Sequence, residues 1–474
     1  MRRAWKAALI GATALLTAAM SAAPAQAAPQ TFVNGADVIT TGGTVMHAHG
    51  GGVIEDGGYY YMLGEQRVDG GNLFNAVSMY RSTDMVNWTH ANDILTRSSH
   101  PDLDPANIER PKVIYNAEYD HYVMWAHKEN GTDYGDAESA VAVSDTVDGD
   151  YTYRGSFRPL GHMSRDQTVF VDDDGTAYLI SAARENYDLH IYRLTDDYLD
   201  VEELLYSFDG DHREAPAVFE RNGVYFLVTS GATGWNPNQA KYATTTNFPD
   251  GPWSGWQNLG DGTTYGSQPT YVLEIAGSQQ TSYMYMGDRW AGASGGPPNE
   301  STYVWLPLRF PSNRTLAMDW SPQITIDTAT GVVEGVQGET TTMTARHSGK
   351  CADVVSGSTA DGAEIIQYTC NGGGNQQWQI QSTGGGYHQI MSWSSGKCLD
   401  VDGSSTANGA QLIQWPCNGQ PNQQWELRDA GGGHVLLVAR HSGKCVDVTS
   451  GSTEDSARLK QYDCHGGTNQ QWSL

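Results

Sequence analysis

The chain has 474 residues and a formal net charge of −26, so it is strongly acidic. Such a surface repels phosphate backbones and anionic lipid headgroups, which excludes nucleic acid and anionic membranes from the expected partners. The length exceeds what one hydrophobic core usually serves, so we expect about two or three domains.

The first segment, residues 1–27, is typical of a secretory signal peptide. Three cations precede an Ala- and Leu-rich run, and Ala25-Gln26-Ala27 offers a small-residue cleavage site. The apolar run is too short to span a bilayer and no later segment is long enough, so we expect a secreted, extracellular protein. Cleavage would take the net charge from −26 to −29.

In residues 33–327 short apolar runs alternate with Gly, Asn and Asp. The whole chain contains 25 Tyr, 14 Trp and 55 Gly, a composition that suits an all-β protein with many turns. Runs such as 59–63 and 122–125 have the length of strands, and no segment has the period of an amphipathic helix. Many short strands at regular spacing indicate a sandwich, a barrel or a propeller.

An internal repeat distinguishes these folds. In five segments a polar residue precedes a short strand, a turn and a second apolar strand; these polar residues are His49, Glu109, Asp166, Glu214 and Gln268. A step of about fifty to sixty residues suits one four-stranded blade, so the sequence predicts a five-bladed β-propeller. Because innermost strands line a central channel, we expect the polar side chains to meet at one mouth.

Glu214 stands directly before a predicted β-hairpin. It precedes an apolar run that Asn222-Gly223 separates from a second one, which is a strong hairpin signal. Taken alone, Glu214 is a solvated residue at a strand end beside Arg213. Its recurrence at an equivalent place in the repeat makes it a functional candidate.

The composition changes at about residue 340, where three copies follow with a period of 47. Each copy closes with Asn-Gln-Gln-Trp, and the six cysteines fall one pair per copy, as Cys351/Cys370, Cys398/Cys417 and Cys445/Cys464. A secreted context and an even count favour three disulfides within the copies over free thiols or a metal site.

These copies resemble the ricin B-type β-trefoil, carbohydrate-binding module family 13, because Gln-x-Trp recurs in step with the cysteines. In that family an Asp and an Asn bind sugar hydroxyls and an aromatic ring stacks on the sugar. The resemblance assigns these roles to Asp353, Tyr368 and Asn375, to Asp400, Trp415 and Asn422, and to Asp447, Tyr462 and Asn469. It assigns Trp378, Trp425 and Trp472 to the core.

The region before the copies resembles glycoside hydrolase family 43, a family of five-bladed propellers, and within it the exo-β-1,3-galactanase branch. The motifs that carry the resemblance follow in order at residues 47–52, 63–65, 109–113, 164–168, 214–217, 233–238 and 267–270. The expected organisation is a signal peptide at 1–27, a propeller at 28–330, a linker at 331–339 and a trefoil at 340–474.

Inverting hydrolysis requires a protonated acid at the leaving oxygen and a base that activates water on the opposite face. By resemblance Glu214 is the acid, and Asp166 tunes and orients it; an ion pair with Arg165 is the alternative role of Asp166. The family's usual base, an Asp in the first blade, is missing here. The closest branch uses an amide in its imidic acid form, which indicates Gln268. Glu109 is the rival and chemically the easier base.

Further positions match sugar contacts of that branch, and these are Glu65, Tyr134, Thr233 and Trp235. His49 either lines the pocket or is a core histidine. No cofactor is expected, and no metal site is predicted, although some relatives hold a structural Ca²⁺ in the channel. We expect a monomer.

Three functions compete. The first is an exo-acting enzyme that releases galactose units from β-1,3-galactan, such as the arabinogalactan backbone, while the trefoil holds the polysaccharide. The second is an α-L-arabinofuranosidase or β-xylosidase, which the missing first-blade Asp disfavours. The third is a lectin-like galactan binder without catalysis, which the presence of Glu109, Asp166 and Glu214 disfavours.

Overall fold

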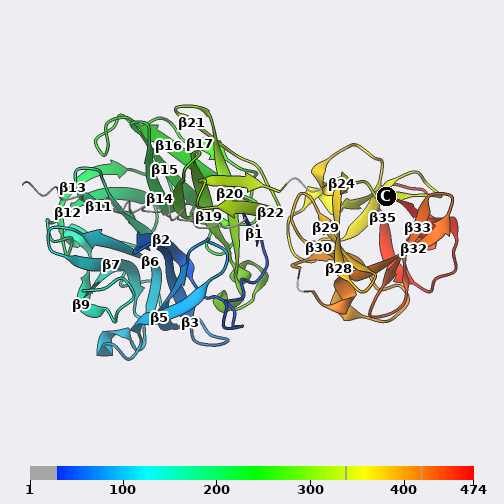
Figure 1. Cartoon of the computed structure of the whole chain (residues 1–474), viewed down its shortest axis with the longest axis horizontal. Helices are drawn as coiled ribbons and strands as arrows, with labels where there is room; N and C mark the ends of the chain where they lie inside the picture. The colour runs from blue at the N-terminus through cyan, green and yellow to red at the C-terminus, as the bar shows by residue number, and fades with distance from the viewer. Residues whose placement is uncertain (1–28, 337–338, 418) are drawn as a thin grey trace, which may run out of the picture.

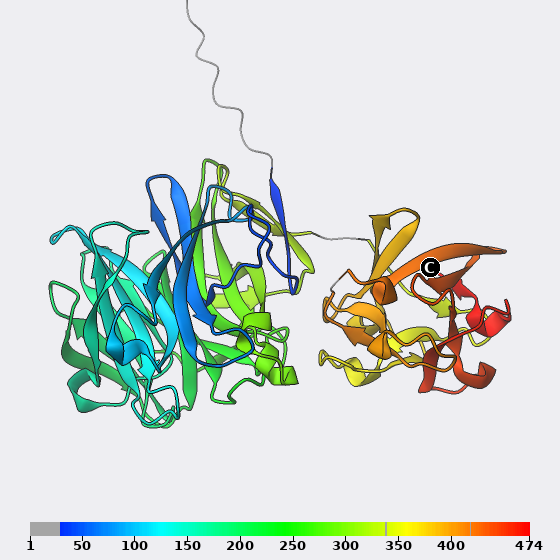
Figure 2. The ribbon, with the colours of Figure 1, turned by 90° about the horizontal axis from the view of Figure 1, so that it is seen from below.

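The computed structural model describes residues 29–336, 339–417 and 419–474, so the expected signal peptide lies outside the described residues. The described chain forms two lobes and is all β, with 36 strands, short 3₁₀ helices and no α-helix (Figure 1). None of its helices has the length and apolar character needed to cross a membrane. Figure 2 shows the same two lobes after a quarter turn.

The N-terminal lobe contains five antiparallel sheets of four consecutive strands each. They are β2 (His49–Asp56), β3 (Tyr59–Arg67), β4 (Phe74–Ser82) and β5 (Thr89–Thr96); β6 (Asn107–Asn116), β7 (His121–Glu129), β8 (Glu138–Ser144) and β9 (Thr152–Phe157); β10 (Gln167–Val171), β11 (Ala177–Ala183), β12 (Asp188–Leu194) and β13 (Val201–Phe208); β14 (Arg213–Arg221), β15 (Val224–Gly231), β16 (Ala240–Thr245) and β17 (Gln257–Leu259); and β18 (Gln268–Ala276), β19 (Thr281–Arg289), β20 (Thr302–Ser312) and β21 (Thr315–Met318).

The first strands of these sheets pack in a closed ring, β2 on β6, β6 on β10, β10 on β14, β14 on β18 and β18 on β2. This is the arrangement of a propeller, in which the innermost strands surround a central channel. Short 3₁₀ helices interrupt the connections at η1 (Pro101–Leu103), η2 (Pro159–Gly161), η3 (Ala291–Ser294) and η4 (Pro298–Glu300).

The prediction of five blades is wrong as a count of sheets, because the lobe has six. The sixth is three-stranded and joins β1 (Gln30–Val33), β22 (Gln323–Asp327) and β23 (Val332–Gly335). It packs on the fifth four-stranded sheet, where the ring of Phe32 stacks on that of Trp305 at 4.1 Å. The repeat did not reveal it because its strands come from both ends of the region and carry no copy of the polar motif.

Four of the five inner strands shift register directly after their polar residue, at His49, Glu109, Glu214 and Gln268-Pro269. Three of these irregularities hold a residue with positive φ, namely Gly50, Arg110 and Ala215. Bulges bend a strand and change the direction of its side chains, and they are common beside active sites. The local irregularity thus recurs with the polar motif.

The C-terminal lobe is one continuous sheet of 13 strands. They are β24 (Thr340–Thr341), β25 (Thr344–Ala345), β26 (Cys351–Val354), β27 (Ile365–Tyr368), β28 (Trp378–Gly384), β29 (Tyr387–Ser392), β30 (Cys398–Val401), β31 (Leu412–Trp415), β32 (Gln424–Gly431), β33 (His434–Ala439), β34 (Cys445–Val448), β35 (Ala457–Tyr462) and β36 (Trp472–Ser473). Its 3₁₀ helices are η5 (Val355–Gly357), η6 (Gly374–Gln376), η7 (Asp402–Ser404), η8 (Pro421–Gln423), η9 (Thr449–Gly451) and η10 (Thr468–Gln470).

The three copies have nearly identical geometry. The predicted disulfides are confirmed, each with a Cα–Cα distance of 5.1 Å, and they are Cys351–Cys370, Cys398–Cys417 and Cys445–Cys464. Trp378, Trp425 and Trp472 are fully buried, and each indole N–H donates to a backbone carbonyl of its own copy. Their predicted core role is therefore confirmed.

The two halves of each disulfide differ in exposure, which the sequence pattern did not reveal. The first cysteine of every copy begins a strand and is buried, whereas Cys370 and Cys464 are exposed. Both follow the last residue of a strand by two positions, where the chain has left the sheet. Cys417 is partly buried instead. The predicted disulfides Cys351–Cys370 and Cys445–Cys464 thus hold, but Cys370 and Cys464 lie at the surface rather than in the core.

Gly51 offers a test of the first bulge, because a Cβ added there would lie 1.6 Å from the carbonyl oxygen of Leu63. Backbone atoms form this contact, so relief requires β2 and β3 to separate. We expect Gly51→Ala to lower the free energy of unfolding by about 2 kcal/mol or more, measured by denaturant titration. Gly255→Ala is the control, because its Cβ meets nothing within 4 Å. Equal stability of the two variants would contradict the account.

Candidate active site

The structure brings together the polar residues of four inner strands. Glu109, on β6, and Asp166, just before β10, have carboxylate oxygens within 4.8 Å of each other. Gln268, at the start of β18, donates from Nε2 to Glu214 Oε1 at 3.0 Å. The expected convergence at one mouth of the channel therefore occurs.

Arg110 links these residues, and the sequence analysis missed it. Its guanidinium contacts Asp166 Oδ2 at 3.1 Å and donates to Gln268 Oε1 and, at 3.0 Å, to the carbonyl of Pro269. The alternative pairing of Asp166 with Arg165 is replaced by this contact, because Arg165 pairs with Glu185. The available signal was its place beside Glu109 in the repeated motif.

Glu214 lies within β14 and is only 6% exposed, so it is not the solvated strand-end residue of the alternative interpretation. Arg213 donates to Thr229 through its guanidinium instead. Burial, and next the negative charge of Asp166, raise the pKa of Glu214 to about 8. A carboxyl group with this pKa is protonated at neutral pH and can act as a general acid.

Both the oxygen and the nitrogen of the Gln268 amide form hydrogen bonds. Its Oε1 accepts from Arg110 and from Trp290 Nε1 at 2.7 Å, while Nε2 donates to Glu214 and to Ser230 Oγ at 3.0 Å. Two donors at Oε1 stabilise the ordinary amide and oppose a proton on that oxygen. An imidic acid form of Gln268 therefore requires these two hydrogen bonds to be exchanged.

Glu109 is ionised. Its Oε1 accepts from Arg67 at 2.9 Å and from the Tyr134 hydroxyl at 2.8 Å, and Oε2 lies 3.2 Å from His127 Nδ1. Burial opposes the charge, but Arg67 and His127 outweigh it and hold the pKa of Glu109 well below its usual range. Glu109 is thus a carboxylate at every physiological pH, as a base must be, although a weak one.

Arg67 also pairs with Glu65, whose pKa burial raises to about 7 despite that cation. Arg67 and His127 are functional neighbours that the sequence analysis missed. Both had a signal: Arg67 follows Glu65 by two positions and so shares its face of β3, and His127 pairs with Glu109 across β6 and β7.

The remaining predicted sugar-contact residues, Trp235, Thr233 and His49, differ in how accessible they are to a ligand. Trp235 is 37% exposed and lies edge-on to Trp290 at 5.2 Å, which places an aromatic wall beside Gln268. The hydroxyl of Thr233 is occupied, because it donates to the carbonyl of Asn236 at 2.6 Å. His49 is buried, stacks on a tyrosine and contacts Asp288 Oδ1 at 3.0 Å, which favours the core interpretation.

A metal does not fit the cluster of Glu109, His127 and Asp166, although its ligand atoms lie close together. Hydrogen bonds to two carboxylates outweigh burial and raise the pKa of His127 to about 9, so a metal would have to displace a proton from its ring. Arg67 and Arg110 already neutralise the two acids of the cluster. The group is therefore a hydrogen-bonded ion network.

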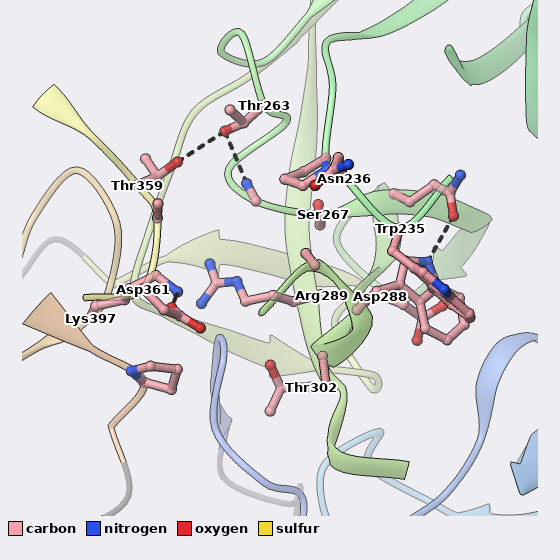
Figure 3. A pocket seen from close by; sticks show the side chains of 18 of the residues that line it. Trp235, Asn236, Thr263, Ser267, Asp288, Arg289, Thr302, Thr359, Asp361 and Lys397 are labelled. Atoms are coloured by element: carbon pink, nitrogen blue, oxygen red, sulfur yellow. Dashed lines mark hydrogen bonds and ion pairs between the residues drawn. The ribbon is translucent and has the colours of Figure 1, made fainter. Parts of the chain in front are cut away.

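A cavity of about 940 Å³ opens beside this centre and is lined by Gln268, Trp290 and Trp235. Figure 3 shows this cavity from close by, with Trp235 at one side. Ligand pockets of this size, at the upper end of the usual range, combine aromatic walls with a few polar groups. The cavity extends to the C-terminal lobe.

The three trefoil candidates share one design, a buried carboxylate near an exposed ring. Asp353, Asp400 and Asp447 each accept from the Gln of the closing motif at 2.8 Å. The rings of Tyr368, Trp415 and Tyr462 are 39%, 39% and 45% exposed. The amides differ: Asn422 and Asn469 donate to the carboxylate of their copy, whereas Asn375 donates to the carbonyl of Val354.

Comparison with known proteins gives the family. Residues 38–278 match the model of glycosyl hydrolases family 43, and residues 331–415, 374–462 and 421–474 match that of the ricin-type beta-trefoil lectin domain-like family. A search of the curated proteins gave no match.

Among solved structures, the chain is similar to an exo-beta-1,3-galactanase from Clostridium thermocellum, with 48% identity over 94% of this chain and 99% of that one and a TM-score of 0.64. An exo-beta-1,3-galactanase from Phanerochaete chrysosporium with beta-1,3-galactotriose shows 29% identity over 91% and 99%, with a TM-score of 0.66. A family 43 beta-1,3-galactosidase with galactodeoxynojirimycin shows 34% identity over 61% and 99%, with a TM-score of 0.56. The chain belongs to glycosyl hydrolases family 43 and is a glycoside hydrolase with a ricin-type lectin domain.

Proposed function

We propose that this glycoside hydrolase is an inverting exo-β-1,3-galactanase that releases galactose units from β-1,3-galactan. The observation that carries the proposal is the similarity, over nearly the whole length of both chains, to an exo-beta-1,3-galactanase. The buried Glu214, with its raised pKa, is consistent with the acid that such a reaction needs.

In the proposed mechanism Glu214 protonates the leaving glycosidic oxygen, and water attacks the anomeric carbon from the opposite face. Asp166 keeps Glu214 protonated through its negative charge, while Arg110 balances the charge of Asp166. The proton that the water loses passes to the nitrogen of Gln268 in its imidic acid form, which also orients the water, or, in the rival assignment, to the carboxylate of Glu109. Of these two, only Glu109 carries the negative charge that removes a proton directly.

The C-terminal lobe is proposed to anchor the enzyme on its polymer, because a tethered binding module raises the local concentration of the substrate. We further propose that residues 1–27 export the protein and are removed. Finding the intact N-terminus on protein recovered from culture medium would contradict removal.

The first test is analysis of early products by NMR, with linear β-1,3-galactooligosaccharides as substrate. We expect α-galactose from the wild type, because inversion at a β-linkage gives the α-anomer. Glu214→Gln keeps the shape but removes the proton, and we expect its rate to fall by about a thousandfold or more. Early β-galactose would refute inversion. Release from arabinoxylan alone would indicate a pentosidase, and no release from any polymer would indicate a binding protein.

Gln268→Ala and Glu109→Gln, assayed in the same way, identify the base. If Gln268 orients the water, we expect its truncation to lower kcat about a hundredfold or more while Glu109→Gln mainly raises KM. Near-full kcat in Gln268→Ala, together with a collapse in Glu109→Gln, would transfer the base role to Glu109. Rescue of Glu109→Gln by azide would confirm that transfer.

The pH dependence tests the coupling of Asp166 to Glu214. The acid must be protonated, so we expect kcat/KM to fall as the pH rises through about 8. Asp166→Asn removes the negative charge that favours the protonated form, so the fall should begin about one pH unit lower. An unchanged alkaline limb in this variant would show that Asp166 does not set the pKa of the acid.

The anchoring role is tested by retention on insoluble galactan. We expect the double variant Tyr368→Ala, Tyr462→Ala to bind about tenfold more weakly, because each substitution removes an exposed stacking ring. Tyr119→Ala is the control, since this tyrosine is 50% exposed in the turn between β6 and β7. Equal retention of both proteins would refute anchoring through these rings.

A further inference from the structure

The cavity beside Gln268 is formed by both lobes. Its N-terminal wall includes Trp235, Gln268 and Trp290, and its C-terminal wall consists of the segment 357–361 with Lys397, Trp415 and Pro416. In Figure 3, Asp361, Lys397 and Thr359 lie across the cavity from the side chains of the N-terminal lobe. One space therefore runs from Gln268 to the C-terminal lobe, where the first copy contributes residues 357–361 and the second contributes Lys397, Trp415 and Pro416.

The three trefoil copies are not equivalent in this respect. Trp415 lines the cavity, and the next two residues, Pro416 and Cys417, line a second one of about 480 Å³ between the lobes. Tyr368 and Tyr462, the counterparts of Trp415, line neither of these two cavities. Only the second ring of the three is thus part of the space that contains Gln268.

Specific contacts hold the second copy in this place. Arg289 donates to the carbonyl of Ser395 in the second copy at 3.4 Å, and in the adjoining first copy the hydroxyl of Thr359 lies 3.4 Å from that of Thr263. Trp320 of the N-terminal lobe packs so closely on Gly396 that a Cβ there would lie 2.3 Å from its ring. The interface therefore depends on Arg289, on Trp320 and on Gly396, which has no side chain and so leaves room for the Trp320 ring.

A buried ion pair adjoins this contact. Lys397 pairs with Asp361, and the Lys397 side chain is 5% exposed, whereas its counterparts Lys350 and Lys444 are 19% and 17% exposed. The difference arises because the N-terminal lobe covers the second copy. The charges are mutually compensated, so the cavity presents a polar but nearly neutral wall here.

The composition of the cavity suits a carbohydrate chain. Indole rings stand on both lobes, at Trp235 and Trp290 on one and at Trp415 on the other, and hydroxyl and carboxylate groups lie between them, including Thr302, Thr359 and Glu300. Sugar rings bind through apolar contact of their C–H faces with aromatic rings and through hydrogen bonds from their hydroxyls. The lining of the cavity thus combines the aromatic and polar groups that a saccharide chain needs.

We propose that Trp415 is a distal subsite of the catalytic cleft: a galactan chain whose terminal unit lies at Glu214 continues through the cavity and rests on Trp415. The second trefoil copy then selects for chain length, while the first and third copies serve as anchors. This inference rests on the proposed galactanase activity, and it adds a specificity-determining residue from the other lobe.

The test compares kcat/KM on soluble galactooligosaccharides of increasing length, starting from the disaccharide. We expect kcat/KM of the wild type to rise with the length of the substrate. On the longest chains we expect kcat/KM of Trp415→Ala to be about tenfold lower than that of the wild type, because its KM is higher. Tyr119→Ala, which removes an exposed ring outside both sites, should keep the wild-type ratio between long and short substrates. Trp415 is partly exposed, so its truncation leaves the core intact; melting temperatures check this.

The outcomes separate the two proposals. If the wild type releases nothing from galactan, the proposed function fails. If it releases galactose but Trp415→Ala keeps the length dependence, or if Tyr119→Ala loses it equally, the distal subsite is refuted. Calorimetric binding of the same oligosaccharides to Glu214→Gln, with and without Trp415→Ala, gives a readout free of turnover; equal affinities for the longest chain would likewise overturn the subsite.

Discussion

Burial of the Arg110 guanidinium at the mouth of the channel is the interaction on which the rest of the site depends. A buried cation is tolerated only with compensating charges and hydrogen bonds, and Arg110 finds these on two other inner strands, at Asp166, Gln268 and Pro269. Its positive φ, part of the bulge in β6, lets it reach them. Loss of this side chain would leave the half-buried Asp166 without this counter-ion and Gln268 without one of its donors.

This placement separates the roles of two neighbouring acids. Arg110 contacts Asp166 directly, so that carboxylate is charge-balanced, whereas Gln268 stands between Arg110 and Glu214. Glu214 therefore feels burial and the charge of Asp166 more than it feels the cation, and its pKa rises to about 8. A single arginine thus pairs with one carboxylate, while burial and the charge of that carboxylate raise the pKa of its neighbour Glu214 into the range that acid catalysis requires.

The sequence was informative where a pattern repeats. The polar residue ahead of each inner strand identified Glu109, Asp166, Glu214 and Gln268, because equivalent strand starts converge in a propeller. The three disulfides and the buried tryptophans followed from a repeat in the same way. The sixth sheet escaped because its strands are drawn from both ends of the region and repeat nothing.

Arg110, Arg67 and His127 escaped for another reason. Their importance lies in contacts across strands, such as the pairing of His127 with Glu109, and a chain read in order does not reveal which side chains meet in space. The tuning of pKa values was beyond reach for the same reason, since it depends on how deeply each group is buried.

The second trefoil copy likewise differs from the other two through its surroundings and not through its repeated motif. The three copies share their motifs and their disulfide geometry, yet the interface with the N-terminal lobe gives one of them a different environment. A ring on a flexibly linked module would meet the polymer at a distance from the cleavage point, and would raise only the local concentration. A ring fixed in the wall of the catalytic cavity acts on the same chain that is being cleaved. Because Arg289 and Trp320 hold the second copy against the catalytic lobe, binding energy gained at Trp415 is available to position the scissile bond at Glu214.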